Sequence, residues 1–282
     1  MRVVLTGGTG YIGSAVLRRL LEGGHEVTAV VRSDDSAALV REAGASAVIG
    51  DLSDVAWFSN VLADADGAIH AADLGGEGDD RVIDAVESAF GGTTRPYLHT
   101  GGIWSWGSGD DLSEESPLAP PALTAWRAAR EARVLAADVT AAVIAPGIVY
   151  GNGGGIPVGV IAGARDADGV VTLVGSGEQH WTSVHVDDLA DLYVRALEQS
   201  ATGTFLAVSG VNPTVRELGE AAGSAVRAES DDASRARLGA GFADALLLDQ
   251  QAGGSRARTV LGWMPSRPSV LDELRELASA RA

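Results

Sequence analysis

Apolar and polar positions along the chain predict strands and helices in alternation. Residues 3–5 form an apolar run typical of a buried strand, and residues 14–21 are apolar at helical spacing. The succession continues with strands over residues 26–31, 46–52 and 67–72 and a helix through Trp57 and Leu62. Strands that alternate with helices through short loops predict an α/β fold with a doubly wound parallel sheet. We expect a cofactor to lie across the carboxyl ends of its strands.

A glycine-rich segment, TGGTGYIG at residues 6–13, joins the first strand to the first helix. Glycine permits positive φ angles and a close approach of the backbone to a pyrophosphate, and the first N–H groups of a helix attract anions. A strand before the segment and a helix after it are the context that a dinucleotide-binding motif requires. We therefore expect Gly7, Gly10, Tyr11, Ile12 and Gly13 to bind a nucleotide cofactor.

Arg32 follows the predicted second strand, where a bound dinucleotide presents its adenosine ribose. A carboxylate at this place binds the 2′-hydroxyl of NAD, whereas an arginine can pair with the 2′-phosphate of NADP. We expect NADP(H) to be preferred. NAD(H) is the alternative, because Asp34 and Asp35 follow directly and Arg32 could instead be a solvated surface side chain.

Composition excludes several classes of function. The 282 residues carry a net charge of −17, which repels nucleic acid and anionic membrane surfaces. There is no cysteine for disulfides or thiolate chemistry, and all 21 basic residues are arginine, so no lysine can form a Schiff base. The five histidines show no metal-ligand spacing, and no apolar run is long enough to span a membrane. We expect a cytoplasmic protein that acts on a small molecule and binds no metal.

Six segments occur along the chain in the order typical of one protein family. They are TGGTGYIG at 6–13, Asp51-Leu52, His70-Ala71-Ala72, APGIVYG at 145–151, VHVDDLA at 184–190 and ARTVLGWMP at 257–265. The set resembles the extended short-chain dehydrogenases/reductases, which include NAD-dependent epimerases and dehydratases. The resemblance implies a Rossmann-type domain over 1–150 and a small substrate lobe over 151–282, from which about 181–209 returns to the core. It also implies cofactor contacts at Asp51, Leu52, Ala71, Ala72 and Pro146.

The catalytic residues of that family are replaced in this chain. The family uses a Tyr, a Lys four residues later and a Ser or Thr, and the best alignment places Trp126, Arg130 and Gly102 at these three positions. Arg130 can still donate hydrogen bonds to the nicotinamide ribose, and we expect it to bind the cofactor there. An indole cannot shuttle a proton near neutral pH, and glycine offers no side chain. The usual triad is therefore absent.

Other polar residues are candidates for the missing proton donor. Ser105 and Tyr150 follow strands near the expected nicotinamide position, and Asp73 and His180 could act as acid or base. The arginine that grips a nucleotide-sugar diphosphate in the family has no counterpart between residues 175 and 188. We therefore expect a substrate without phosphate groups.

Tryptophan fills the predicted substrate side instead. The segments expected there carry four of the six tryptophans, namely Trp104, Trp106, Trp126 and Trp181, and His180 precedes the last. Flat indole rings suit an aromatic or polycyclic ligand, although we expect about half of the four to be packed in the core.

Three functions fit these observations. The first is an NADP(H)-dependent oxidoreductase or epimerase that acts on a small, aromatic or polycyclic substrate. The second is a dehydratase, cyclase or isomerase without net redox change, and the third is a non-catalytic protein that senses the NADP redox state. The family resemblance further implies a homodimer that pairs the helices over 79–90 and 122–137.

Overall fold

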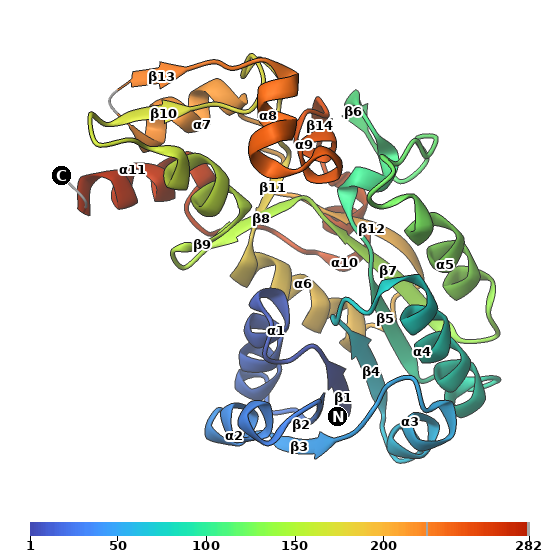
Figure 1. The fold of residues 1–282 in the computed structure, drawn as a ribbon. Coiled ribbons are helices and arrows are strands. Elements are labelled where there is room, and N and C mark those ends of the chain that lie inside the picture. Colours follow the sequence, from blue (N-terminus) through green and yellow to red (C-terminus); the bar gives the residue numbers. More distant parts are fainter. Residues whose placement is uncertain (224, 281–282) are drawn as a thin grey trace.

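A seven-stranded parallel sheet forms the centre of the computed structural model, which describes residues 1–223 and 225–280 (Figure 1). The strand order is β12-β7-β5-β4-β1-β2-β3, and every pairing is parallel. The strands are β1 (Arg2–Thr6), β2 (Glu26–Val31), β3 (Ser46–Ile49), β4 (Gly67–His70), β5 (Pro96–Thr100), β7 (Thr140–Pro146) and β12 (Gly203–Ala207). The predicted doubly wound α/β fold is confirmed. β3 and β4 end two to three residues earlier than expected, so residues 51–52 and 71–72 lie in the loops that follow.

Helices cover both faces of the sheet, as the alternating pattern predicts. One face packs against α1 (Tyr11–Glu22), α2 (Asp34–Glu42), α6 (Val186–Glu198) and α10 (Ser255–Leu261). The other packs against α3 (Val55–Leu62), α4 (Gly75–Phe90) and α5 (Ala125–Ala136). Each face buries its own apolar cluster, which fixes the strand ends relative to the helices.

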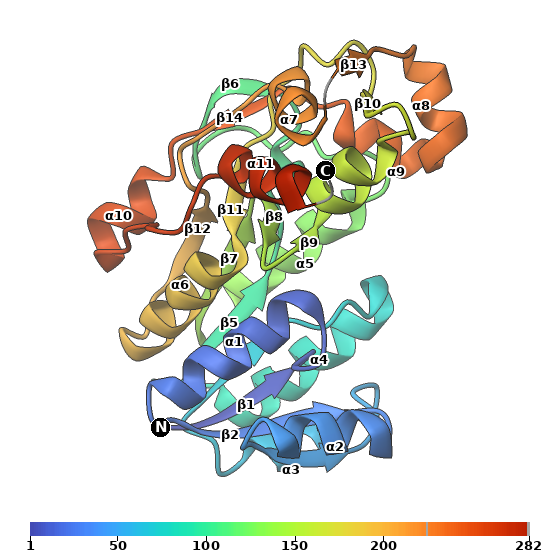
Figure 2. The same cartoon turned by 90° about the vertical axis from the view of Figure 1, so that its left-hand side faces the viewer.

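A lobe of shorter elements stands over the carboxyl ends of the strands (Figure 2). It contains a sheet of β8 (Ile148–Gly151), β9 (Gly154–Gly155) and β11 (Ser183–His185), and the strand pairs β10 (Val170–Thr172) with β13 (Ala225–Arg227) and β6 (Gly109–Leu112) with β14 (Gln250–Ala252). Its helices are α7 (Val215–Ala222), α8 (Asp231–Leu238), α9 (Ala240–Leu246) and α11 (Val270–Ala280). Short turns of helix are η1 (Ile103–Trp106), η2 (Pro157–Ile161) and η3 (Ala162–Ala164).

The lobe and the sheet are joined by several passages of the chain. After β11, the chain returns through α6, which packs on α1, to β12 at the edge of the main sheet. The buried carboxylate of Asp188 accepts hydrogen bonds from the backbone N–H groups of Ser266 and Arg267, which ties the C-terminal segment to α6. Within residues 1–223 and 225–280, no helix is long and apolar enough to cross a lipid bilayer.

Candidate functional site

The glycine-rich turn between β1 and α1 fits closely against the end of β4. Gly7 has a φ of +74°, and a Cβ there would lie 2.5 Å from the carbonyl carbon of Ala71. A Cβ on Gly13 would lie 2.0 Å from the carbonyl oxygen of Gly7, which also accepts a hydrogen bond of 2.9 Å from the Gly10 N–H. No side chain larger than hydrogen fits at Gly7 or Gly13 without moving the backbone.

Helix α1 starts at this turn with free donors. Gly10 is its N-cap and provides no side-chain cap, so the first N–H groups of the helix are available to an anion. This turn suits a dinucleotide phosphate, as the sequence predicts. Tyr11 and Ile12 follow, and the Tyr11 hydroxyl donates a hydrogen bond of 2.7 Å to the carbonyl oxygen of Gly151 in the lobe. Burial raises the pKa of this hydroxyl, which therefore stays protonated.

The residues expected at the adenosine end lie in loops after neighbouring strands. Arg32 follows β2 and is exposed, and Ser33 caps α2 directly afterwards. Asp51 is also exposed and accepts a hydrogen bond of 2.8 Å from the Ser53 N–H, which lowers the pKa of its carboxyl. Leu52 is buried beside it. Parallel pairing of β1, β2 and β3 brings these loops to the same edge as the glycine turn.

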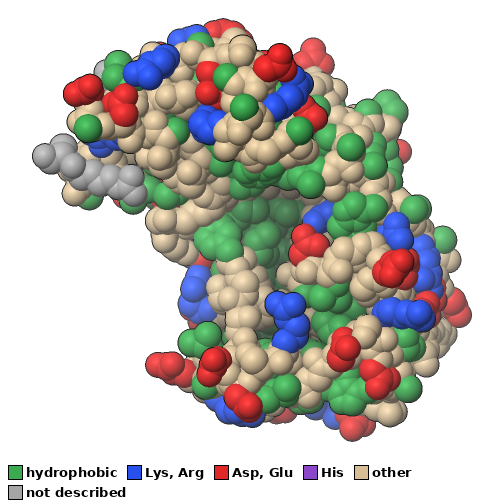
Figure 3. Space-filling view, viewed as in Figure 1, with side chains coloured by type: hydrophobic (Ala, Val, Ile, Leu, Met, Phe, Trp, Pro, Cys, Tyr) green, Lys and Arg blue, Asp and Glu red, His purple; other side chains and the backbone are tan. Residues whose placement is uncertain are grey.

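A cavity of about 490 Å³ opens at the carboxyl ends of β5 and β7, and we call it the strand-end cavity. Figure 3 shows a hollow between the lobe and the sheet in which hydrophobic side chains gather. Tyr11 and Ile12, next to the glycine turn, line the cavity together with Pro146. The other lining residues are Asp73, Gly75, Gly101, Gly102, Ile103, Trp104, Leu123, Thr124, Trp126, Arg127, Gly147, Ile148, Val149, Gly155 and Ile156. The cavity is therefore continuous with the expected cofactor position and mostly apolar.

Arg127 brings a positive charge to this apolar wall. Its Nη1 donates a hydrogen bond of 3.2 Å to the Gly101 carbonyl oxygen, and its Nη2 lies 3.4 Å from a carboxylate oxygen of Asp73. The guanidinium carbon stands 5.1 Å from the ring centre of Trp126. These contacts hold the guanidinium at the end of β5, beside Gly102.

Glu131 lies one helical turn after Arg127, on the same face of α5. Its side chain is buried beneath Gly101, and among the described residues its Oε1 has no hydrogen-bond partner. Burial raises the pKa of the Glu131 carboxyl to about 7, although the nearby Arg127 cation opposes this change. A carboxyl group that changes its charge near neutral pH therefore lies next to the cavity wall.

Of the three residues expected to be catalytic, Tyr150 and Arg130 make hydrogen bonds within the protein, whereas the Ser105 Oγ is buried without a partner among the described residues. The Tyr150 hydroxyl donates to the Pro268 carbonyl oxygen at 2.9 Å, and the Tyr150 ring packs edge-on against His185 in the lobe. Ser105 is buried in η1, outside the cavity lining. Arg130 turns toward α4, where Nη2 donates to Asp80 at 2.8 Å. Of the three, none lines the strand-end cavity, and their catalytic role stays a prediction.

The four tryptophans divide between the cavity and the core. Trp104 and Trp126 line the strand-end cavity. Trp106 is buried in a small cluster under β7 and β12, and the Trp181 Nε1 donates to the Leu246 carbonyl oxygen inside the lobe. His180 pairs with Asp249 at 2.9 Å and lies outside the cavity lining.

Arg127, Glu131 and Thr124 were missed by the sequence alignment, which placed Trp126 and Arg130 at the family's Tyr and Lys. Val134 is buried in the core, and positions 127 and 131 precede it at helical spacing. This periodicity is a signal that places residues 127 and 131 on the inward face of α5, one residue later than the alignment did.

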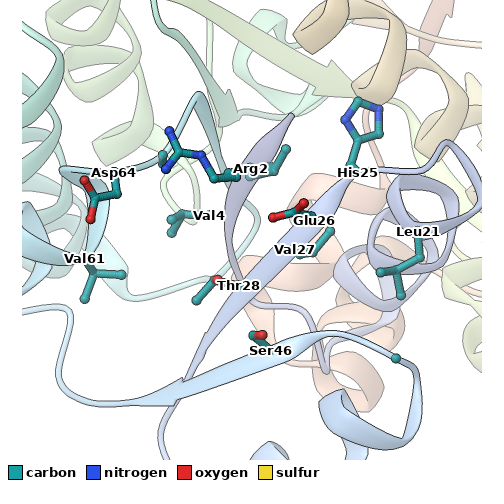
Figure 4. A pocket seen from close by; sticks show the side chains of 13 residues that line it. Arg2, Val4, Leu21, His25, Glu26, Val27, Thr28, Ser46, Val61 and Asp64 are labelled. Carbon is teal, nitrogen blue, oxygen red and sulfur yellow. The ribbon is translucent and has the colours of Figure 1, made fainter.

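A second pocket, of about 370 Å³, lies at the opposite edge of the sheet (Figure 4). It is bordered by residues at the amino ends of β1 and β2, including Arg2, His25 and Glu26. In parallel α/β sheets, ligands bind at the carboxyl ends of the strands. The strand-end cavity, next to the glycine turn, is therefore the candidate site.

Comparisons with known proteins identify the nucleotide-binding part of the chain. A family model for NAD(P)H-binding domains matches residues 7–95. The chain is 30% identical to a 3-diazoavenalumate denitrifying reductase from a Streptomyces species, over 97% of this chain and 99% of that protein. It is 29% identical to the UDP-glucose 4-epimerase of Mycolicibacterium smegmatis, over 94% of each. The human epimerase family protein SDR39U1, solved with NADPH, has a similar fold, with a TM-score of 0.75 and 23% identity over 99% of both chains. The N-terminal part is an NAD(P)-binding domain.

Proposed function

We propose that this chain, which belongs to the extended short-chain dehydrogenase/reductase family of NAD(P)-dependent enzymes, is a reductase. Its proposed substrate is a small, aromatic or polycyclic molecule without phosphate groups. The observation that carries the proposal is the strand-end cavity itself. Tyr11 and Ile12 border both the glycine turn and the cavity, while Trp104 and Trp126 belong to its apolar wall. A substrate held against the indoles would therefore lie beside the cofactor position.

Different residues of the site would bind the cofactor and the substrate. Gly7, Gly10 and Gly13 would hold the dinucleotide phosphates, and Pro146 would border the nicotinamide end. Bound NADPH supplies a hydride to the substrate. Trp104 and Trp126 would stack on a flat substrate and exclude water from the reacting centre.

The proton for the substrate oxygen requires another source than the family's tyrosine. Thr124 and Tyr11 carry the hydroxyl groups of the cavity wall, and the Tyr11 hydroxyl already donates to Gly151. The Thr124 Oγ1 is itself buried and has no hydrogen-bond partner among the described residues, so the substrate and water would have to reach it inside the wall. We assign to Thr124 the relay of a proton from water. Thr124→Val should then lower kcat by roughly a hundredfold, and an unchanged kcat would leave water as the direct donor.

NADP(H) is the proposed cofactor of preference. Arg32 is exposed after the end of β2 and just before the start of α2. Its side chain would not have to break a hydrogen bond to a described residue in order to pair with a 2′-phosphate. To test the whole proposal, NADPH oxidation and product formation are measured in the same reaction, with a panel of aromatic ketones and quinones as substrates. A reductase consumes one NADPH per product.

One observation favours the non-redox alternative. Gly102 has no side chain, and Arg127 and Glu131 on the inward face of α5 carry no hydroxyl group that could donate a proton. A dehydratase, cyclase or isomerase would form product with no net change in NADPH. Substrate labelled with deuterium at the reacting carbon separates this case from an epimerase. An epimerase that works by hydride transfer takes the deuterium onto the cofactor and returns it to the product, whereas an isomerase that works by proton transfer exchanges it with water. Trp126→Phe should alter substrate affinity more than the pH profile in every case, since an indole carries no ionisable proton.

We also propose a homodimer. α5 exposes a row of small and apolar side chains beside α4, namely Ala125, Ala129, Ala132, Leu135 and Ala136. Small side chains allow two helices to approach closely, so this face suits pairing with a second copy. Light scattering at high concentration should give twice the 28.7 kDa of the chain, and Leu135→Glu should give the monomer. A parent protein that remains monomeric would refute the dimer.

A further inference from the structure

The strand-end cavity carries a single positive charge. Arg127 is the one cation among the described residues that line it, and Asp73 is the one anion. The rest of the wall is mainly apolar, and the chain as a whole carries a net charge of −17. Long-range electrostatics therefore repel anions, and an anionic ligand could be held only by a local cation.

The Arg127 guanidinium is oriented but still partly accessible. The hydrogen bond to the Gly101 carbonyl oxygen and the position over the Trp126 ring fix its plane, while 23% of its side chain remains exposed. An arginine has five N–H donors, of which the described contacts at Nη1 and Nη2 use two. The Arg127 Nε–H is buried, so one N–H on each of Nη1 and Nη2 is left. Donors thus remain for a ligand.

The charge of Arg127 is only partly compensated by its neighbours. Asp73 makes a long contact of 3.4 Å, and 72% of the Asp73 side chain is exposed to water, which screens the pair. Glu131 is buried behind the guanidinium, and burial raises the pKa of its carboxyl to about 7, so it is partly protonated at neutral pH. Neither carboxyl group fully neutralises the cavity.

Open space lies next to the guanidinium. A Cβ built on Gly102 would meet only one neighbouring atom within 4 Å, the Arg127 Nη1, at 3.9 Å. The volume that a serine or threonine side chain would occupy in the family is therefore available to a ligand. A group placed there would contact Nη1.

We propose that the strand-end cavity binds the carboxylate of a flat aromatic acid through Arg127. A planar guanidinium matches a carboxylate through two parallel hydrogen bonds, and Trp104 and Trp126 provide surfaces for an aromatic body. This inference rests on the proposed function, because it names the class of substrate for the same cavity. It assigns Arg127 to substrate binding and leaves the cofactor to the glycine turn.

Calorimetry with matched acids and amides tests the proposal. The probes are benzoate, trans-cinnamate and 2-naphthoate, each compared with its neutral amide, on the 282-residue chain saturated with NADP⁺. At least one acid should bind about tenfold or more tightly than its amide, as expected for hydrogen bonds to a charged group. Arg127→Gln should remove that difference and leave the affinities for the amide and for NADP⁺ within about twofold of the parent values.

Two further variants sharpen the test. Asp73→Asn removes the competing carboxylate and should tighten acid binding severalfold, which also decides the matter if Arg127→Gln does not fold. Arg133→Gln, on the same helix but paired with Asp84 and Glu87 away from the cavity, is the matched control and should leave acid binding unchanged.

Three outcomes overturn the inference while the proposed reductase stands. In the first, no acid binds more tightly than its amide. In the second, Arg127→Gln weakens NADP⁺ binding instead of acid binding, which would assign Arg127 to the cofactor. In the third, Arg133→Gln has the same effect as Arg127→Gln. A protein that binds neither NADPH nor NADH would instead refute the proposed function. In that case the affinities for acids and amides would be measured on the protein without nucleotide, and they would still test the role of Arg127.

Discussion

Replacing Glu131 by glutamine should make the protein more stable, and increasingly so as the pH rises. The carboxyl of Glu131 is buried under Gly101, and its Oε1 has no hydrogen-bond partner among the described residues. Ionising this group in place costs desolvation energy that the Arg127 cation offsets only in part. Glutamine has nearly the same shape and cannot ionise, so Glu131→Gln removes the cost of the charge.

The size of the effect follows from the pKa of the carboxyl. Burial raises it from 4.5 to about 7. Below pH 4.5 both the folded and the unfolded chain hold the proton, and the charge has no effect. Between pH 4.5 and 7 the unfolded chain loses the proton while the folded chain keeps it, so stability falls as the pH rises. At about 1.4 kcal/mol for each pKa unit, the loss above pH 7 reaches roughly 3 kcal/mol.

Thermal unfolding at pH 5 and pH 8 measures this loss. With an unfolding entropy of about 2.1 cal/mol/K per residue, 3 kcal/mol corresponds to a Tm difference of about 5 °C for a chain of this length. The Tm gain of Glu131→Gln over the parent should therefore be about 5 °C larger at pH 8 than at acidic pH. Glu42→Gln, at an exposed position on α2, controls for the removal of one negative charge. A gain that does not depend on pH, or one equal to that of Glu42→Gln, would refute the reasoning.

Four other substitutions test the site. Gly7→Ala should destabilise the protein and weaken NADPH binding far more than Gly24→Ala. The two φ angles are similar, +74° and +76°, but only a Cβ on Gly7 meets backbone atoms. Equal losses of unfolding free energy for the two variants in urea would contradict the close fit of the turn. Arg32→Ala should weaken NADPH binding by roughly 1–3 kcal/mol and leave NADH binding unchanged in calorimetry; parent affinities that are already equal would end the assignment. Tyr150→Phe should cost about 1 kcal/mol of stability, and neither it nor Ser105→Ala should reduce kcat, whereas a drop of about a hundredfold would return that residue to the catalytic site.

The nucleotide-binding turn could be predicted from the sequence because its requirements are local. Gly7 and Gly13 are needed wherever a strand, a tight turn and a helix must approach a phosphate. The positive φ of Gly7 and the contact of Gly13 with the Gly7 backbone lie within the turn, although Gly7 also packs against Ala71 after β4. The doubly wound sheet follows similarly from the alternation of strands and helices. Residue types and their spacing therefore suffice to predict the backbone conformation of such elements.

The cavity wall could not be predicted to the same degree, because side-chain direction on a helix changes by about 100° with each residue. An alignment displaced by one position turned attention to Trp126 and Arg130, while Arg127 and Glu131 face the sheet. Tyr150 shows the same problem on a strand. It lies near the end of a strand, β8, as expected, yet its hydroxyl donates to a carbonyl oxygen more than a hundred residues away, and no local pattern contains that partner.

The inward face of α5 carries two charged side chains four residues apart, which is also the spacing of the Tyr and Lys that the family uses. In the family, a neutral proton donor comes first and a cation follows four residues later. Here a permanent cation, Arg127, comes first, and a buried carboxyl, Glu131, takes the second place. A guanidinium cannot release a proton near neutral pH, and burial raises the pKa of the Glu131 carboxyl to about 7, so we expect Glu131 to change the binding of an acid in this range of pH. As Glu131 ionises near pH 7, it neutralises Arg127 from behind, and an acid should then bind less tightly while its amide is unaffected. The charge that selects the ligand and the group that changes with pH are therefore separate residues, one helical turn apart.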